Sequence, residues 1–159
     1  MAAVAERIRF HRDELEPVTT VMARLTAERK GWMNFHPEVP EQDEAPPASL
    51  LGFFSARGPS VPLCTWVPEA LRRERRVPAQ LGVQHGTGPR VAARLDSLGL
   101  PVPAGWRVSQ DHPRRGLVVQ VVPDEPLGTV AGWVLDAGDA LSLIRVTGWW
   151  TADVYADRA

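Results

Sequence analysis

The chain has 159 residues, 44 % of them hydrophobic and 23 % charged, and its formal net charge is -1. These values are ordinary for a globular protein and exclude a fibrous or a low-complexity chain. Cys64 is the only cysteine, which excludes an intramolecular disulfide and a cysteine-based zinc cluster. No apolar run reaches the ~18 residues of a membrane span, so we expect a cytoplasmic protein that contacts no membrane.

We expect one globular domain over residues 1–159. Residues 1–15 fit either a helix or a loosely attached extended arm, because Val4, Ile8 and Phe10 satisfy both periodicities. Residues 40–48 are acidic and contain prolines, which predicts a surface loop. Residues 57–115 carry ten arginines and four acids, so the middle of the chain is basic between acidic flanks. Such a segment favours an anionic partner, or pairs with the flanks after folding.

The first half of the chain predicts one helix and several strands. A helix over 17–30 begins with a proline and ends at Gly31, with an apolar face of Val18, Val21, Met22 and Leu25. Residues 32–39 alternate as in a strand that fades at Pro37. Residues 49–56 and 61–67 predict two strands of a hairpin, and residues 68–77 predict a short helix that ends before Pro78.

The second half continues with a strand over 78–85 and a helix that begins at Pro89 and ends at Gly99. Strands follow at 106–111 and 117–122, and the second is apolar enough to predict a central position in the sheet. A long helix opens at 123–126 and keeps helical spacing to Arg145. Gly138 lies in its apolar stripe, which predicts a close approach of another group. Residues 147–155 predict a last strand.

This order of elements predicts an α+β fold. We expect a largely antiparallel twisted sheet of about six or seven strands with three helices packed mainly on one face.

Two short strands that end on histidines indicate where a functional site would lie. His85, Asp111 and His112 are the candidate catalytic residues of a small hydrolase or a metal-dependent enzyme, because a histidine base needs an orienting carboxylate within hydrogen-bond reach. The four histidines lack the HxH or HxxxH spacing of a shared ligand face, so we assign no metal site, and no particular cofactor is indicated. A buried Cys64 would be structural rather than nucleophilic.

The turn from Gly86 to Arg90 feeds directly into a helix start, where free N–H groups and the helix dipole favour an anion. The same turn is also simply a good way to begin a helix. On the anion interpretation the ligand-binding residues are His85, Thr87, Gly88, Arg90, Arg114 and Arg115.

The chain has six tryptophans, and one of the adjacent pair Trp149 and Trp150 could line a groove or an interface. The acidic segment after Trp150 argues against nucleic acid. The favoured hypothesis is therefore a soluble ligand-binding or protein-interaction module whose partner is a small anionic molecule or another protein, with a homodimer as one form.

Overall fold

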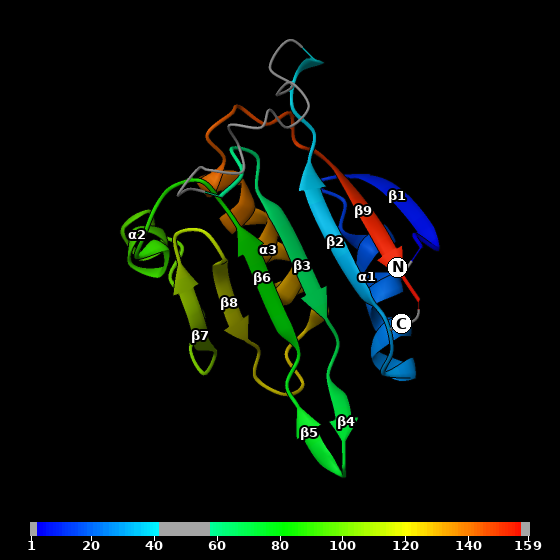
Figure 1. Ribbon diagram of the computed structural model, residues 1–159. Helices are drawn as coiled ribbons and strands as arrows, with labels where there is room; N and C mark the ends of the chain where they lie inside the picture. The colour runs from blue at the N-terminus through cyan, green and yellow to red at the C-terminus, as the bar shows by residue number, and fades with distance from the viewer. Residues whose placement is uncertain (1–2, 42–57, 157–159) are drawn as a thin grey trace.

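The computed structural model describes residues 3–41 and 58–156. Their main feature is a seven-stranded antiparallel sheet (Figure 1). From one edge to the other the strands are β1 (Glu6–His11), β9 (Trp149–Tyr155), β2 (Trp32–Pro37), β3 (Leu63–Val67), β6 (Gln80–Gln84), β8 (Gly116–Gln120) and β7 (Arg107–His112).

Two helices cover one face of this sheet. In Figure 1, α1 (Glu16–Glu28) and α3 (Leu127–Leu141) both lie behind the strands, while α2 (Val91–Ser97) lies beside the β7 edge. The α+β class, the antiparallel sheet and the one-sided helices are confirmed. No helix in residues 3–41 and 58–156 is long and apolar enough to cross a membrane.

The alternation of side chains explains why the helices lie on one side. Met33 pairs with Trp66 and Phe35 with Cys64 across β2 and β3, and all four side chains are buried. Asn34, between them on β2, points to the opposite face, as neighbouring strand residues must. On α1 the predicted stripe is the buried one, formed by Val18, Val21, Met22 and Leu25. Apolar burial between the layers is therefore the main stabilising term.

The predicted helix over 68–77 is wrong. These residues form a separate hairpin, β4 (Ala70–Arg72) and β5 (Arg75–Val77). Arg73 and Glu74 between them have φ angles of 49° and 65°, the left-handed values of a tight two-residue turn. The segment has no apolar stripe for a helix to bury, because Leu71 is 50 % exposed.

Other boundaries also differ from the expectations. Residues 6–11, which fit both periodicities, form the edge strand β1. The apolar β8 is not central, because it lies next to the edge strand β7 and only alternate side chains are fully covered. Helix α3 ends at Leu141, four positions before Arg145. The predicted strand over 49–56, and most of the predicted loop over 40–48, lie outside the described residues.

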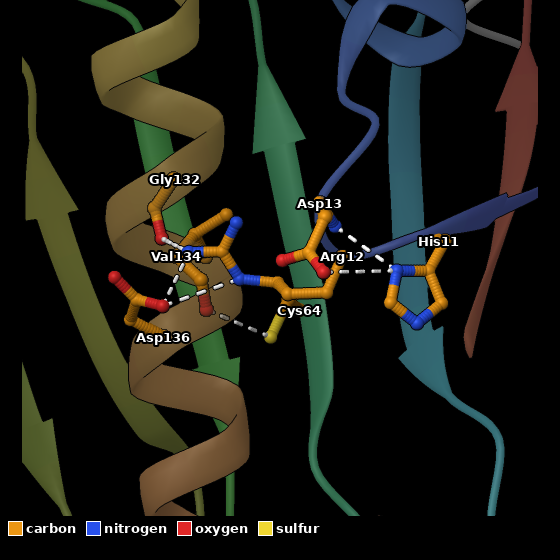
Figure 2. Close-up of polar contacts among 7 residues, drawn as sticks. All are labelled: His11, Arg12, Asp13, Cys64, Gly132, Val134 and Asp136. Atoms are coloured by element: carbon orange, nitrogen blue, oxygen red, sulfur yellow. Dashed lines mark hydrogen bonds and ion pairs between the residues drawn. The ribbon is translucent and has the colours of Figure 1, made fainter. Parts of the chain in front are cut away.

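Helix α3 is attached to the rest of the fold by polar as well as apolar contacts (Figure 2). Arg12, in the connection between β1 and α1, reaches across to Asp136 and to the carbonyl of Gly132. Cys64 on β3 points at the same helix, and its thiol donates to the carbonyl of Val134 over 3.7 Å. These contacts determine the position of α3 along the sheet.

Close packing at Gly138 completes this attachment. A Cβ atom at this position would lie 2.7 Å from Trp150 Cη2 and 3.0 Å from Cys64 Sγ. Both neighbours are fully buried, so neither has free space to move into. The expectation that Gly138 allows a close approach is confirmed, and the approaching group is the indole of Trp150.

We predict that Gly138→Ala destabilises the protein by about 1–3 kcal/mol, because overpacking outweighs the gain in helix propensity. A Cβ atom on Gly132, in the same helix, would meet no other atom within 4 Å. Gly132→Ala is therefore the matched control and is expected to stabilise by up to about 1 kcal/mol. Urea unfolding of both variants checks the pair. Equal effects of the two substitutions would contradict the packing account.

Candidate functional site

A cavity of about 410 Å³ lies where α1 ends and α3 begins. Its floor comes from the sheet, through Trp66 on β3 and Val121 just after β8. One wall is the first turn of α3, and another is the β4–β5 hairpin with the segment leading into it. The volume falls within the usual range of about 300–1,000 Å³ for small-molecule sites. The lining residues are Thr26, Arg29, Trp66, Glu69, Arg76, Ala79, Val121, Val122, Pro123, Asp124, Glu125, Leu127 and Val130.

Trp66 is the feature that distinguishes this cavity. Its indole is 1 % exposed, and its Nε1–H has no hydrogen-bond partner within the described part of the chain. A buried donor without a partner costs about 1–3 kcal/mol, so such groups are rare in folded proteins. The indole N–H can only donate. A group that satisfies it must therefore supply an acceptor.

The charged residues at the cavity are mostly paired with one another. Arg76 binds Glu69 through two hydrogen bonds of 2.9 and 3.0 Å, and this contact raises the pKa of Arg76. Glu125 accepts a 2.9 Å hydrogen bond from the indole of Trp106. Arg29 forms no ion pair with any described residue. The charge of Asp124 acts on Arg76 and adds to the rise in its pKa.

The first turn of α3 adds further donors to the wall. The N–H groups of Thr129 and Val130 bond to the carbonyl of Pro126, and no side chain caps the helix. The N–H groups of Leu127 and Gly128 precede these bonds, at the positive end of a 15-residue helix. This end of α3 therefore lies beside the cavity, which Pro123, Asp124, Glu125 and Leu127 line.

The candidate catalytic residue Asp111 and the predicted anion-binding residue Arg90 both lie at the start of α2. The two carboxylate oxygens of Asp111 accept the N–H groups of Val91 and Ala92 over 3.1 and 3.0 Å. The start of α2 is thus capped by an acid of the chain itself. Arg90, at the N-cap, has a φ of 58°, and α2 has only seven residues.

His85 is fully buried at the end of β6. Its Nδ1 lies 2.9 Å from Thr87 Oγ1 and accepts the N–H of Thr87 over 3.3 Å. Burial lowers its pKa, as does the charge of Arg94, while Asp111 acts in the opposite direction. The neutral imidazole therefore belongs to the turn that contains Gly86 and Gly88.

His112 does not join the other two candidate catalytic residues. Its Nδ1 accepts the N–H groups of Arg114 and Arg115, each over 3.1 Å, which closes the β7–β8 turn. Asp111 and His112 are neighbours on β7, so their side chains point to opposite faces of the sheet. This geometry favours turn and helix stabilisation over a catalytic triad.

The described residues offer neither a metal site nor an activated thiol. Within residues 3–41 and 58–156 no group of three or more His, Cys, Asp or Glu side chains could hold a metal ion. Cys64 is completely buried, and this desolvation, together with the charge of Asp139, raises the pKa of its thiol. A thiol in this state is a poor nucleophile.

The face of the sheet opposite the helices is polar. Arg7 donates to Asp153 over 2.6 and 3.3 Å, and this contact, with His36 adding to it, lowers the pKa of Asp153. Arg9 binds Glu38 and lies 4.1 Å above the ring of Trp149. These charged groups satisfy one another, which is typical of a solvated sheet surface.

Sequence analysis predicted Trp66 only as a core residue and did not link it to a functional site. Trp66 is buried and alternates with partly buried residues on β3, so its pattern indicates burial and nothing more. Whether its N–H finds a partner depends on α1, α3 and the β4–β5 hairpin, which are separate elements of the chain.

No protein-family model matches this chain, and neither the curated proteins nor the solved structures contain a match to it.

We predict that Asp111→Ala destabilises the protein by about 0.5–2 kcal/mol, because the first turn of α2 loses its cap. Asp96→Ala, an exposed substitution on the same helix, removes the same charge and serves as the control. Chemical denaturation of both variants provides the comparison. If Asp111→Ala were as stable as Asp96→Ala, the capping role would be refuted.

The pKa of Asp139, on α3, is raised in the folded protein. Burial, with Asp136 adding to it and Arg12 opposing it, raises the pKa of Asp139 from 3.8 to about 6. Its Oδ1 is buried and has no partner within the described residues. The folded state therefore binds this proton more tightly than the unfolded state. Protonated Asp139 therefore contributes to the free energy of unfolding. This contribution is fully present below pH 4 and is lost as the pH rises through about 6.

We predict that Asp139→Asn is more stable than the wild type at pH 7.5, by up to about 3 kcal/mol, and that the difference shrinks toward pH 4. Urea unfolding across this pH range measures the effect, with Asp96→Asn as the exposed control. A difference that does not change with pH would show that Asp139 ionises normally in the folded protein.

Proposed function

We propose that this protein is a binding module that takes up a small organic molecule in the cavity whose floor includes Trp66. The observation that carries the proposal is the buried Nε1–H of Trp66, which has no partner among the described residues although the indole lines a cavity. A ligand that supplies an acceptor would remove the cost of about 1–3 kcal/mol that this donor imposes on the empty protein.

The surroundings of the donor support the same proposal. Ala79, Val121, Leu127 and Val130 line the cavity together with charged residues. Apolar side chains that can hold a hydrocarbon part, next to polar groups that can fix its orientation, are features of small-molecule sites. The start of α2 is a weaker candidate for an anion site than the cavity is for a small molecule. The carboxylate of Asp111 already accepts the N–H groups of Val91 and Ala92 that an anion would need.

The indole N–H signals of the six tryptophans provide a direct test. In a ¹⁵N-labelled sample screened against a fragment library, we predict that binders move the Trp66 Nε1–H signal downfield, because the N–H gains an acceptor. Trp66→Phe keeps an aromatic ring and removes the donor, and is expected to weaken such binders about three- to tenfold.

Trp150 provides the matched control. Its Nε1 is also buried without a partner in the described residues, but Trp150 does not line the cavity. Its signal should stay in place, and Trp150→Phe should leave the affinities unchanged. A library in which no compound perturbs Trp66, or in which binders perturb Trp150 instead, would overturn the proposal.

A further inference from the structure

The β4–β5 hairpin projects from one end of the main sheet (Figure 1). In the part of the chain that the structure describes, its two strands pair only with each other, so both outer edges of this ribbon are unpaired. All residues from Leu71 to Arg76 are exposed. The hairpin therefore contributes little to the core, and its side chains are accessible to a partner.

Two arginines lie side by side near the tip of the hairpin. Arg72 pairs with Arg75 across the two strands, so their side chains leave the same face with Cβ atoms about 4.5–5.5 Å apart. Neither forms an ion pair with a described residue, whereas Arg76 on the other face binds Glu69. Like charges in directly opposite positions destabilise a strand pair. An anion placed between the two guanidinium groups would replace this repulsion by two attractive contacts.

The turn of the hairpin is also not chosen for stability. Arg73 and Glu74 both have positive φ angles, at positions where asparagine and glycine are normally found. The turn and the cross-strand arginine pair thus both oppose the stability of the hairpin. Local choices that oppose stability are typical of functional sites. The arginines are therefore better explained by binding than by folding.

The surroundings of the hairpin favour a protein partner over a nucleic acid. Glu69, Asp124 and Glu125 line the cavity together with Arg76, so three carboxylates lie near the base of the hairpin. A DNA duplex carries one negative charge for about every 1.7 Å of its length, and a duplex that extended from the tip toward the sheet would meet these carboxylates. An acidic peptide concentrates its charge over a few residues. Arginine is also enriched at protein interfaces.

We propose that the β4–β5 hairpin is a docking element for an acidic, extended segment of another protein. The segment lies along one edge of the ribbon as an added strand, and its main-chain groups pair with the unpaired groups of that edge. Because side chains alternate along a strand, carboxylates at every second position of the segment reach the face of Arg72 and Arg75. This surface is separate from the small-molecule cavity, which neither arginine lines.

A labelled short peptide with glutamate at every second position is the probe, and fluorescence anisotropy measures its affinity. The same peptide with glutamine in place of glutamate is the charge control, and a labelled short DNA duplex is the nucleic-acid control. We expect the glutamate peptide to bind about tenfold or more tighter than the glutamine peptide, because contacts between arginine and carboxylate are charge-assisted. The DNA duplex should bind more weakly than the glutamate peptide at physiological salt.

Substitutions in the hairpin test the two arginines directly. Arg72→Gln combined with Arg75→Gln should weaken the glutamate peptide about tenfold and leave the glutamine peptide unchanged. The urea midpoint of this variant should equal or slightly exceed that of the wild type, because the cross-strand repulsion is removed. Arg94 is exposed on α2, away from the hairpin (Figure 1), so Arg94→Gln is the matched control and should keep full affinity.

Three results would overturn the proposal. The first is equal binding of the two peptides, or an Arg94→Gln variant that loses as much affinity as the hairpin variant. The second is a hairpin variant that unfolds more readily than the wild type, which would show that Arg72 and Arg75 serve the fold. The third is a DNA duplex that binds more tightly than the glutamate peptide and depends on both arginines, which would replace the protein partner by a nucleic acid.

Discussion

Burial of one face of the sheet beneath α1 and α3 is the constraint on which the rest of the structure depends. The strands alternate, so one set of side chains forms the core and the other remains polar. Helix α3 approaches the sheet most closely at Gly138, where the indole of Trp150 and the thiol of Cys64 occupy the space of a side chain. Arg12 adds a polar attachment to the same helix.

The cavity follows from where these two helices stop. Glu28 ends α1 and Leu127 begins α3 at the same end of the sheet, so the core-facing indole of Trp66 lies under the space between them. The β4–β5 hairpin extends from that end and adds Arg76 to the rim (Figure 1). A buried indole without a hydrogen-bond partner among the described residues thus lines a cavity that charged groups also line.

Periodicity predicted what depends on local sequence. The stripe from Val18 to Leu25 and the alternation around Trp66 are expressed in the chain itself, and both are found in the structure. The predicted helix over 68–77 is wrong because the prolines on both sides of this segment resemble helix boundaries. The hairpin turn is formed by Arg73 and Glu74 in left-handed conformations, so the sequence lacks the glycine or asparagine that normally indicates such a turn. The position of β8 beside an edge strand reflects strand order, which hydropathy does not encode.

The candidate site was harder to predict than the fold, for a physical reason. The turn before α2 has every local mark of an anion site, but Asp111, some twenty residues later, supplies the anion from within the chain. Trp66 presents the opposite case, because its pattern indicates only core, and its unsatisfied donor emerges when distant elements are assembled around it. Hydrogen-bond satisfaction is a property of the assembled fold, so neither outcome was visible in residue spacing.

A crystal structure of the protein with a fragment that moves the Trp66 indole signal would test the central claim most directly. The account predicts an acceptor atom of the fragment within about 3.2 Å of Trp66 Nε1 and its apolar part against the apolar residues that line the cavity. A structure in which an atom of the protein itself accepts the Trp66 N–H, and the cavity is closed, would contradict it.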